Sequence, residues 1–368
     1  MTTDEAAGTG SRAGVGTGEV VLETQDLAKY YPVRVGAVLK RKIGEVKAVD
    51  GVSLCLRHGQ TLGLVGESGS GKSTLARMLV GVDKPTRGRI LVNGEDVTRI
   101  GRRGRKRLRR NIQMIFQDPY TSLNPRMSIG EIVGEPYAIH PDATPKGGRQ
   151  RGVAELLDLV GLNPDHVNRY PHQFSGGQRQ RIGIARALAL NPKILICDEP
   201  VSALDVSIQG QVINLLERLQ NELGLAYLFI AHDLSVVRHI ADQVAVMYLG
   251  RMVESGADSD VYDHAAHPYT QALMSAVPVP DPTLRGQRAE IILEGDVPSP
   301  MNPPAGCNFH TRCWLANQLA AGDLVASGAV EEQRDAVPPV CRQEVPVLTT
   351  YGTGQHLTAC HFSRELVR

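Results

Sequence analysis

Long apolar runs are what this 368-residue sequence most clearly lacks. No stretch approaches the roughly 20 apolar residues that a bilayer-spanning helix needs, because Arg, Gly or Asp interrupts each candidate. The formal net charge is only +1, so there is no overall basic field for nucleic acid and no acidic excess for a cationic partner. We therefore expect a chain that does not cross a membrane by itself and whose charged surfaces are local.

An export signal is also missing from the first residues. Residues 1–18 are rich in Gly, Ala, Thr and Ser and have no apolar core, so we expect a disordered leader rather than a signal peptide. Disulfides are not expected in a chain without an export signal, so metal binding is the more specific hypothesis for cysteines that cluster late in the sequence. Four of the six cysteines fall in the last fifth of the chain: Cys307, Cys313, Cys341 and Cys360.

The order of apolar segments predicts an α/β fold. The chain is too long for one small core, which indicates one large domain plus a satellite, or two domains. Residues 20–60 alternate like strands, apart from a basic insertion at 32–45 that resembles a loop. Further on, short apolar strands alternate with helical segments, which predicts a parallel sheet covered by helices. The expected strands are 61–65, 112–116, 194–197, 225–230 and 243–248, with a hairpin turn at Asn93-Gly94.

Two segments stand apart from this alternation. Residues 101–110, GRRGRKRLRR, favour a solvated helix face, with nucleic-acid or lipid contact as the alternative. Beyond Ala257 proline becomes frequent, which disfavours long helices and indicates an extended appendage. We place a domain boundary near 257 and a helical subdomain at about 119–190.

A glycine-rich loop, GESGSGKS, occupies residues 66–73 between an apolar strand and a helix-compatible segment. Its glycines allow successive backbone N–H groups to face one anion, and the positive helix N-terminus adds to them. Lys72 then supplies a charge for the β- and γ-phosphates, and the Ser73 hydroxyl is a Mg²⁺ ligand. The loop predicts nucleoside triphosphate binding, with ATP-binding residues Gly66, Ser68, Gly69, Ser70, Gly71, Lys72, Ser73 and Thr74.

Two carboxylates end the buried strand at 194–197. Asp198 is placed to hold Mg²⁺, directly or through water, and Glu199 can polarise an attacking water. A surface Asp-Glu pair that merely begins a loop is the alternative, but the apolar strand before it favours the catalytic interpretation.

A second glycine-rich turn, FSGGQ at 174–178, also opens a helix and offers N–H groups to an anion. Alone it is a weak signal. In order, the loop at 66–73, Gln117, FSGGQ, Asp198-Glu199, the SALD sequence at 202–205 and His232 resemble the ATP-binding cassette (ABC) ATPases over about residues 20–257. The resemblance implies a P-loop NTPase cassette at 19–257, with a RecA-like core, a β-rich subdomain and a helical signature subdomain.

The resemblance also assigns roles. Tyr31, or less securely Tyr30, stacks on adenine; Gln117 touches Mg²⁺ and water and faces the membrane partner; His232 contacts the γ-phosphate. Ser175, Gly176, Gly177 and Gln178 form the signature loop, which caps nucleotide bound by the opposite subunit, and Asp205 belongs to the D-loop. The chain has one P-loop, so the resemblance implies a second ATPase subunit from another molecule; a heterodimer is favoured, with a homodimer as the alternative. Phe174 departs from the commoner Leu at a packing position.

Segments outside the cassette narrow the resemblance. HPYTQAL at 267–273, Pro298-Ser299-Pro300 and GCNFHTRC at 306–313, together with QDPYTSLNP at 117–125, look like the ATPases that drive dipeptide, oligopeptide and nickel uptake. This likeness covers nearly the whole chain, with residues 258–368 as a Pro- and Cys-rich C-terminal extension. It implies a peripheral subunit on the cytoplasmic face of the cell membrane, two transmembrane permease subunits, an extracytoplasmic substrate-binding protein and no nucleic acid.

Three questions stay open at this stage. The four late cysteines resemble the ligands of a [4Fe-4S] cluster found in some members of this branch, with Zn²⁺ also using His310 or His361, or unligated thiols, as alternatives. A soluble ATPase acting on nucleic acid through residues 102–110 is the competing function, whereas the intact Glu199 and His232 argue against a non-hydrolytic scaffold. The cargo, whether dipeptide, longer peptide, nickel chelate or another solute, is not specified.

Overall fold

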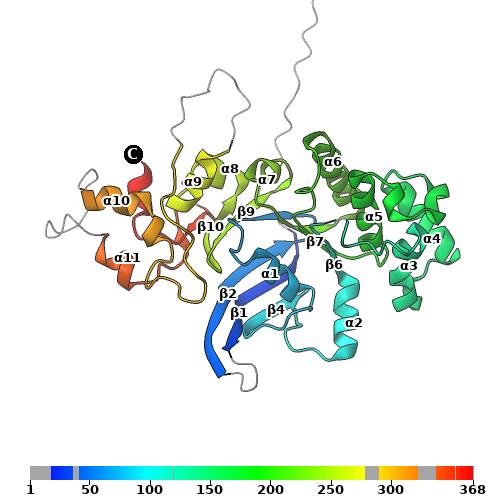
Figure 1. Ribbon diagram of the computed structural model, residues 1–368, viewed down its shortest axis with the longest axis horizontal. Coiled ribbons are helices and arrows are strands. Elements are labelled where there is room, and N and C mark those ends of the chain that lie inside the picture. The colour runs from blue at the N-terminus through cyan, green and yellow to red at the C-terminus, as the bar shows by residue number, and fades with distance from the viewer. Residues whose placement is uncertain are drawn as a thin grey trace, which may run out of the picture.

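The computed structural model describes residues 18–35, 41–118, 120–277, 290–321, 337–352 and 354–367. The expected disordered leader lies almost entirely outside these residues. A large sheet crosses the molecule, a smaller sheet packs beside it, a helical group covers one end, and the C-terminal residues form a lobe at the opposite end (Figure 1).

The large sheet has the order β11-β12-β10-β9-β3-β8-β7-β6. Its strands β9, β3, β8, β7 and β6 are parallel to one another. Strands β10, β12 and β11 extend the sheet from β9, and each pairs antiparallel with its neighbour. Every residue of β3, β7 and β8 is buried, which explains their continuous apolar sequences. The bounds are β3 Thr61–Val65, β6 Ile112–Ile115, β7 Ile194–Asp198, β8 Ala226–Ile230, β9 Gln243–Tyr248, β10 Arg251–Ala257, β11 Thr349–Thr350 and β12 Leu357–Thr358.

The smaller sheet is antiparallel and corrects one prediction. Its order is β2-β1-β4-β5, with β1 Val20–Val35, β2 Arg41–Arg57, β4 Arg87–Val92 and β5 Glu95–Asp96. The loop predicted at 32–45 is wrong for 32–35 and 41–45, where Pro32 pairs with Glu45; residues 36–40 are outside the described ranges. Strand β4 flanks β1 only as far as Ala28. Beyond Ala28 no described strand pairs with that side of β1, so a proline without an N–H is tolerated.

Helices flank both sheets, and most lie where the sequence predicts them. Residues 128–188 hold α3, α4 and α5, which form the helical group. The basic segment is an exposed helix, α2, in which only Leu108 is buried. The bounds are α1 Lys72–Leu79, α2 Arg102–Asn111, α3 Ile129–Ile139, α4 Gly148–Leu159, α5 Gly176–Leu188, α6 Val206–Leu223, α7 Leu234–Ile240, α8 Asp258–Asp263, α9 Pro268–Ser275, α10 Trp314–Ala321 and α11 Pro339–Gln343. No helix in the described ranges is long and apolar enough to span a bilayer.

The residues beyond 257 pack on the large sheet. Strand β12 pairs with β10, and Tyr262, Tyr269 and Phe309 belong to the same apolar core as β7 and β8. Glu254 on β10 is fully buried and accepts hydrogen bonds from the backbone N–H groups of Ala266 and His267, at 2.6 and 2.9 Å. The extension therefore completes both the sheet and its polar network. The domain boundary near 257 stays a prediction.

A buried carboxylate joins the two sheets. Asp50 on β2 accepts hydrogen bonds from Arg251 Nε and Nη2 on β10, at 3.1 and 2.6 Å, and from the Tyr30 hydroxyl. Arg87 adds a further contact at 3.2 Å. Burial raises the pKa of this carboxyl, but the hydrogen bonds from Tyr30 and Arg251 outweigh it and hold the pKa below its usual value.

We predict that Asp50→Asn lowers the free energy of unfolding by about 3 kcal/mol at neutral pH, because it leaves a partly buried Arg251 without its anion. A carboxyl whose folded pKa is lowered stabilises the fold above its unfolded pKa and loses that effect as the pH falls through the folded value. The difference between variant and wild type should therefore shrink below about pH 4 in urea titrations. Asp158→Asn, at an exposed carboxylate of α4, should change stability by less than about 0.5 kcal/mol. If the stability difference between Asp50→Asn and wild type did not change with pH, the lowered pKa of Asp50 would be contradicted.

Candidate nucleotide-binding site

Two glycines shape the loop at 66–73 because there is no room for a side chain. Gly66 has φ 149° and a Cβ there would lie 2.1 Å from the Met247 carbonyl oxygen. Gly71 has φ 105° and its Cβ would lie 2.1 Å from the Ala48 carbonyl oxygen. The loop is therefore pressed between β9 and β2, and it delivers the chain directly into the N-terminus of α1 at Lys72.

Lys72 is buried and folded back over the loop. Its Nζ donates to the carbonyl oxygens of Gly66 and Glu67, at 2.6 and 2.9 Å. Burial lowers the pKa of this ammonium, and the carboxylates of Glu199 and Asp198 oppose that shift. The positive charge is thus held at the centre of the loop by surrounding oxygen atoms.

Ser73 and Asp198 meet at the end of β7. The Ser73 hydroxyl donates to Asp198 Oδ1 at 3.2 Å, although the two residues are 125 positions apart. Burial raises the pKa of the Asp198 carboxyl, and the charge of Glu199 adds to this, while Ser73 and Lys72 act in the opposite direction. A hydroxyl and a carboxylate side by side are the hard oxygen donors that Mg²⁺ prefers, so this pair fits that ion.

Glu199 lies in a strained backbone conformation. Its φ of 47° is in the left-handed region that favours glycine, and its N–H is fixed by the Ile230 carbonyl at 2.9 Å. Gln117 Nε2 donates to Glu199 Oε2 at 2.7 Å, and His232 Nδ1 lies 3.3 Å from the same oxygen. The structure thus brings together the three residues predicted to be catalytic. Strained backbone of this kind is often found at catalytic groups, and no pattern in the sequence predicted it at Glu199.

The two candidate adenine-stacking tyrosines face different partners. The Tyr31 hydroxyl donates to Asp83 Oδ2 at 2.9 Å, close to the last residues of α1, where Arg77 also pairs with Asp83. Tyr30 instead uses its hydroxyl on Asp50, in the joint between the sheets. Tyr31 is therefore the one beside α1, and its stacking on adenine stays a prediction.

The signature loop opens α5 and faces solvent. Ser175 is the N-cap: its Oγ accepts from Gln178 N at 3.4 Å, while its own N–H donates to Gln178 Oε1 at 3.1 Å. Gly177 packs against Ile208 of α6, and the unusual Phe174 is buried. Within the described residues no hydrogen bond joins 175–178 to the loop at 66–73. Asp205 and Val206, which open α6 beside it, are exposed as well.

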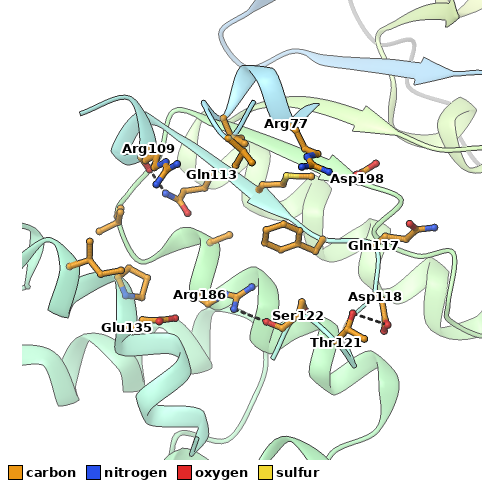
Figure 2. A pocket seen from close by; sticks show the side chains of 18 of the residues that line it. Arg77, Arg109, Gln113, Gln117, Asp118, Thr121, Ser122, Glu135, Arg186 and Asp198 are labelled. Atoms are coloured by element: carbon orange, nitrogen blue, oxygen red, sulfur yellow. Dashed lines mark hydrogen bonds between the residues drawn. The ribbon is translucent and has the colours of Figure 1, made fainter. Parts of the chain in front are cut away.

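An open groove of about 870 Å³ runs from the nucleotide residues to the helical group. Figure 2 shows Asp198 and Gln117 toward one end of it and Glu135 toward the other. Arg186 Nη1 donates to the Ser122 carbonyl at 2.9 Å on its floor, and burial lowers the pKa of this guanidinium. Three apolar side chains are left exposed along the groove: Val82, Phe116 and Ile139.

The four late cysteines occupy one region of the C-terminal lobe. Cys307 N donates to the Cys341 carbonyl at 2.9 Å, and none of the four forms a disulfide. Burial raises the pKa of Cys341 to about 12, and the charges of Cys307 and Cys313 add to that shift, so these sulfur atoms lie within electrostatic reach of one another. Among the described residues, however, no three His, Cys, Asp or Glu side chains are arranged to hold a metal ion.

The sequence did not predict that the C-terminal extension reaches the nucleotide loop. The N–H of Glu67 donates to the Tyr269 hydroxyl at 2.8 Å. Arg312 Nη1 lies 3.0 Å from Glu67 Oε2. Tyr269 and Arg312 lie in segments that stand out in the sequence only for their family resemblance. Both are far from Glu67 along the chain, so no local sequence pattern predicts these contacts.

Comparison with known proteins agrees with this geometry. Residues 49–202 match the ABC transporter family, and residues 253–318 match the family described as "Oligopeptide/dipeptide transporter, C-terminal region". The chain is 52% identical to the oligopeptide transport ATP-binding protein AppF of Bacillus subtilis, covering 93% of this chain and 97% of that protein. It is 49% identical to the dipeptide transport ATP-binding protein DppF of Escherichia coli, covering 86% and 96%.

Solved structures give the same cassette fold. The cbiO1 subunit from Clostridium perfringens, part of the ABC transporter complex cbiONQ, is 28% identical with a TM-score of 0.58, covering 67% of this chain and 92% of its own. A dimeric structure of the bacterial ABC transporter cassette MJ0796 is 28% identical with a TM-score of 0.56, covering 64% and 98%. This chain belongs to the oligopeptide and dipeptide transport ATP-binding proteins of the ABC transporter family.

Proposed function

We propose that this chain is the ATP-hydrolysing subunit that energises import of dipeptides or oligopeptides through a separate membrane permease. The observation that carries the ATPase part is the meeting of Lys72, Ser73, Asp198, Glu199, Gln117 and His232 in one place. The match of 253–318 to the peptide-transporter C-terminal region supports the cargo class. Nickel or another small solute is the alternative cargo, and the solute that stimulates hydrolysis in the reconstituted transporter separates the two.

Hydrolysis follows from the arrangement around Glu199. Its carboxylate accepts a proton from the water that attacks the γ-phosphorus, while Gln117 and His232 fix its orientation. Lys72 offsets charge on the β- and γ-phosphates. Ser73 and Asp198 would hold Mg²⁺, whose charge neutralises phosphate oxygens. The strained backbone keeps the Glu199 carboxylate beside its two partners.

The exposed signature loop supports a two-cassette mechanism. Ser175 and Gln178 lie exposed at the N-terminus of α5, where they can face nucleotide held by a second ATPase subunit. The D-loop residue Asp205 belongs to the same surface. ATP closes the pair only if it binds the closed form more tightly than the open one, and hydrolysis then allows the cassettes to part. A heterodimeric partner is our proposal for the second cassette.

The groove beside Gln117 is where we place the permease. Its exposed apolar residues Phe116 and Ile139 suit an amphipathic helix, and the charges of Glu135 and Arg186 suit its polar side. Because Gln117 contacts Glu199, a helix in this groove is linked to the catalytic carboxylate by one side chain. The subunit would then lie against the cytoplasmic face of the cell membrane, with two permease subunits and an extracytoplasmic binding protein that it never touches.

We expect Glu199→Gln to reduce ATP turnover by about 10²- to 10⁴-fold, because the amide cannot accept the proton. ATP affinity should stay near wild type, and ATP should now accumulate closed dimers, visible by light scattering on size exclusion. Glu222→Gln, an exposed carboxylate on α6, is the matched control and should leave phosphate release unchanged. Turnover at the wild-type rate in the Glu199 variant would exclude it as the base.

The signature loop is tested by Ser175→Arg. The long cationic side chain should block closure over the partner's nucleotide, so the assembled complex should lose at least about tenfold in turnover while equilibrium ATP binding to the isolated subunit stays intact. Ser128→Arg is the matched control, because Ser128 is the N-cap of α3 just as Ser175 is the N-cap of α5. It shows how much turnover is lost when an N-cap alone is removed. Equal turnover in wild-type and Ser175→Arg complexes would rule out the composite site.

For the four-cysteine region we propose a [4Fe-4S] cluster that fastens the C-terminal lobe, with Zn²⁺ as the alternative. Four thiols without disulfides are the donor set that iron-sulfur clusters use. Cys307 and Cys313 act on the pKa of Cys341, and all three act on that of Cys360, which supports one shared region, although no three of them surround a single ion. A multi-iron cluster suits such a spread better than one Zn²⁺, because its ligands bind different iron atoms.

Anaerobically purified protein should be brown and should contain about four iron atoms and four sulfides per chain. Cys341→Ser should lose most of this iron and lower the melting temperature of the protein. Cys55→Ser, in β2 and remote from the late cysteines in sequence, should keep both. Stoichiometric zinc in a colourless sample would favour the alternative, and a sample with neither metal would refute both.

A further inference from the structure

We propose that Arg312, in the C-terminal extension, is a positioning residue of the nucleotide site that holds and neutralises Glu67 of the P-loop. The inference requires that this cassette binds ATP, which the proposed function includes. It depends on neither the cargo nor a metal in the cysteine region. Its consequence is that the extension contributes to ATP affinity.

The ion pair is direct and shielded from water. Arg312 Nη1 donates to both carboxylate oxygens of Glu67, at 3.2 and 3.0 Å, across 245 positions of sequence. The Arg312 side chain is only 9% exposed and that of Glu67 25%. An ion pair at this depth is screened less than a surface pair, so breaking it leaves an unpaired charge with few waters around it.

A second contact from the same extension fixes the backbone of Glu67. The hydroxyl of Tyr269, a fully buried side chain on α9, accepts from the Glu67 N–H at 2.8 Å. Tyr269 packs against Tyr248 and Phe309 with ring centroids 4.7 and 5.4 Å apart, and Phe309 directly precedes the turn His310–Arg312. Tyr269 is therefore part of one aromatic cluster, and Arg312 lies in the turn just after Phe309, so the same cluster positions both residues that contact Glu67.

The charge of Glu67 explains why the contact matters for ATP. Glu67 is the second residue of a loop that must accept a triphosphate, and its carboxylate is close enough to act on the Lys72 ammonium. Without a counter-charge this carboxylate repels the phosphates and competes with them for Lys72. Arg312 cancels that effect and keeps the carboxylate turned toward the extension.

The test measures ATP affinity by isothermal titration calorimetry in full-length Glu199→Gln protein, where turnover does not interfere. Arg312→Gln should weaken ATP binding about tenfold. Adding Glu67→Gln to that variant should restore affinity to within about threefold, because the repelling charge is gone. In protein with an intact Glu199, Arg312→Gln should raise the KM for ATP while kcat changes by less than about twofold. Arg342→Gln, an exposed arginine of α11, is the matched control.

Rescue by the double variant is the result that a merely structural role would not give. Unchanged ATP affinity in Arg312→Gln, or an equal loss in the double variant, would overturn the proposal. Should Arg312→Gln fail to fold, Arg312→Lys keeps the charge and should bind ATP within about threefold of the parent; a tenfold loss there refutes neutralisation. Absence of ATP binding in the parent protein would instead refute the proposed function.

Discussion

This structure depends on one constraint: two carboxylates and one ammonium must lie close together at the carboxyl ends of buried parallel strands. Asp198 and Glu199 are adjacent at the end of β7, and Lys72 is held beside them without full solvation. Burial pushes the pKa of Lys72 down and that of Asp198 up, so holding these charged groups together costs free energy. A bound triphosphate with its cation rebalances these charges. Binding and stability are therefore coupled, and such a site responds strongly to its ligand.

Holding those charges requires two sheets to meet at the P-loop. The loop is confined by carbonyl oxygens of β9 and β2, which is why only glycine is accommodated at 66 and 71. The same two sheets are joined by Asp50 and Arg251. A change in the packing between the sheets would shift the walls against which the loop rests. The small sheet therefore helps to define the shape of the loop at 66–73 as well as presenting Tyr31.

The sequence predicted the parts whose physics is local. The P-loop between strand and helix, the buried strand before Asp198, the Asn93-Gly94 turn and the helix that opens at FSGGQ each depend on neighbouring residues, and each element lies where predicted. The strands through 32–35 and 41–45 were missed because Pro32 and nearby charges disfavour a strand unless one side of it is unpaired. The Arg312 contact was missed because no local pattern encodes a pairing across 245 positions.

The C-terminal extension also supplies partners for buried charge. Glu254 is fully buried on β10, and the described hydrogen-bond partners of its carboxylate all come from the extension: two backbone N–H groups and His356 Nε2 at 2.7 Å. A carboxylate buried without those partners would be costly. Strand β12 also covers the edge of β10, which would otherwise carry unpaired backbone groups. The proline-rich segment is thus tied to the cassette at two acidic residues, Glu254 and Glu67, and the second of these is part of the loop that we propose binds ATP.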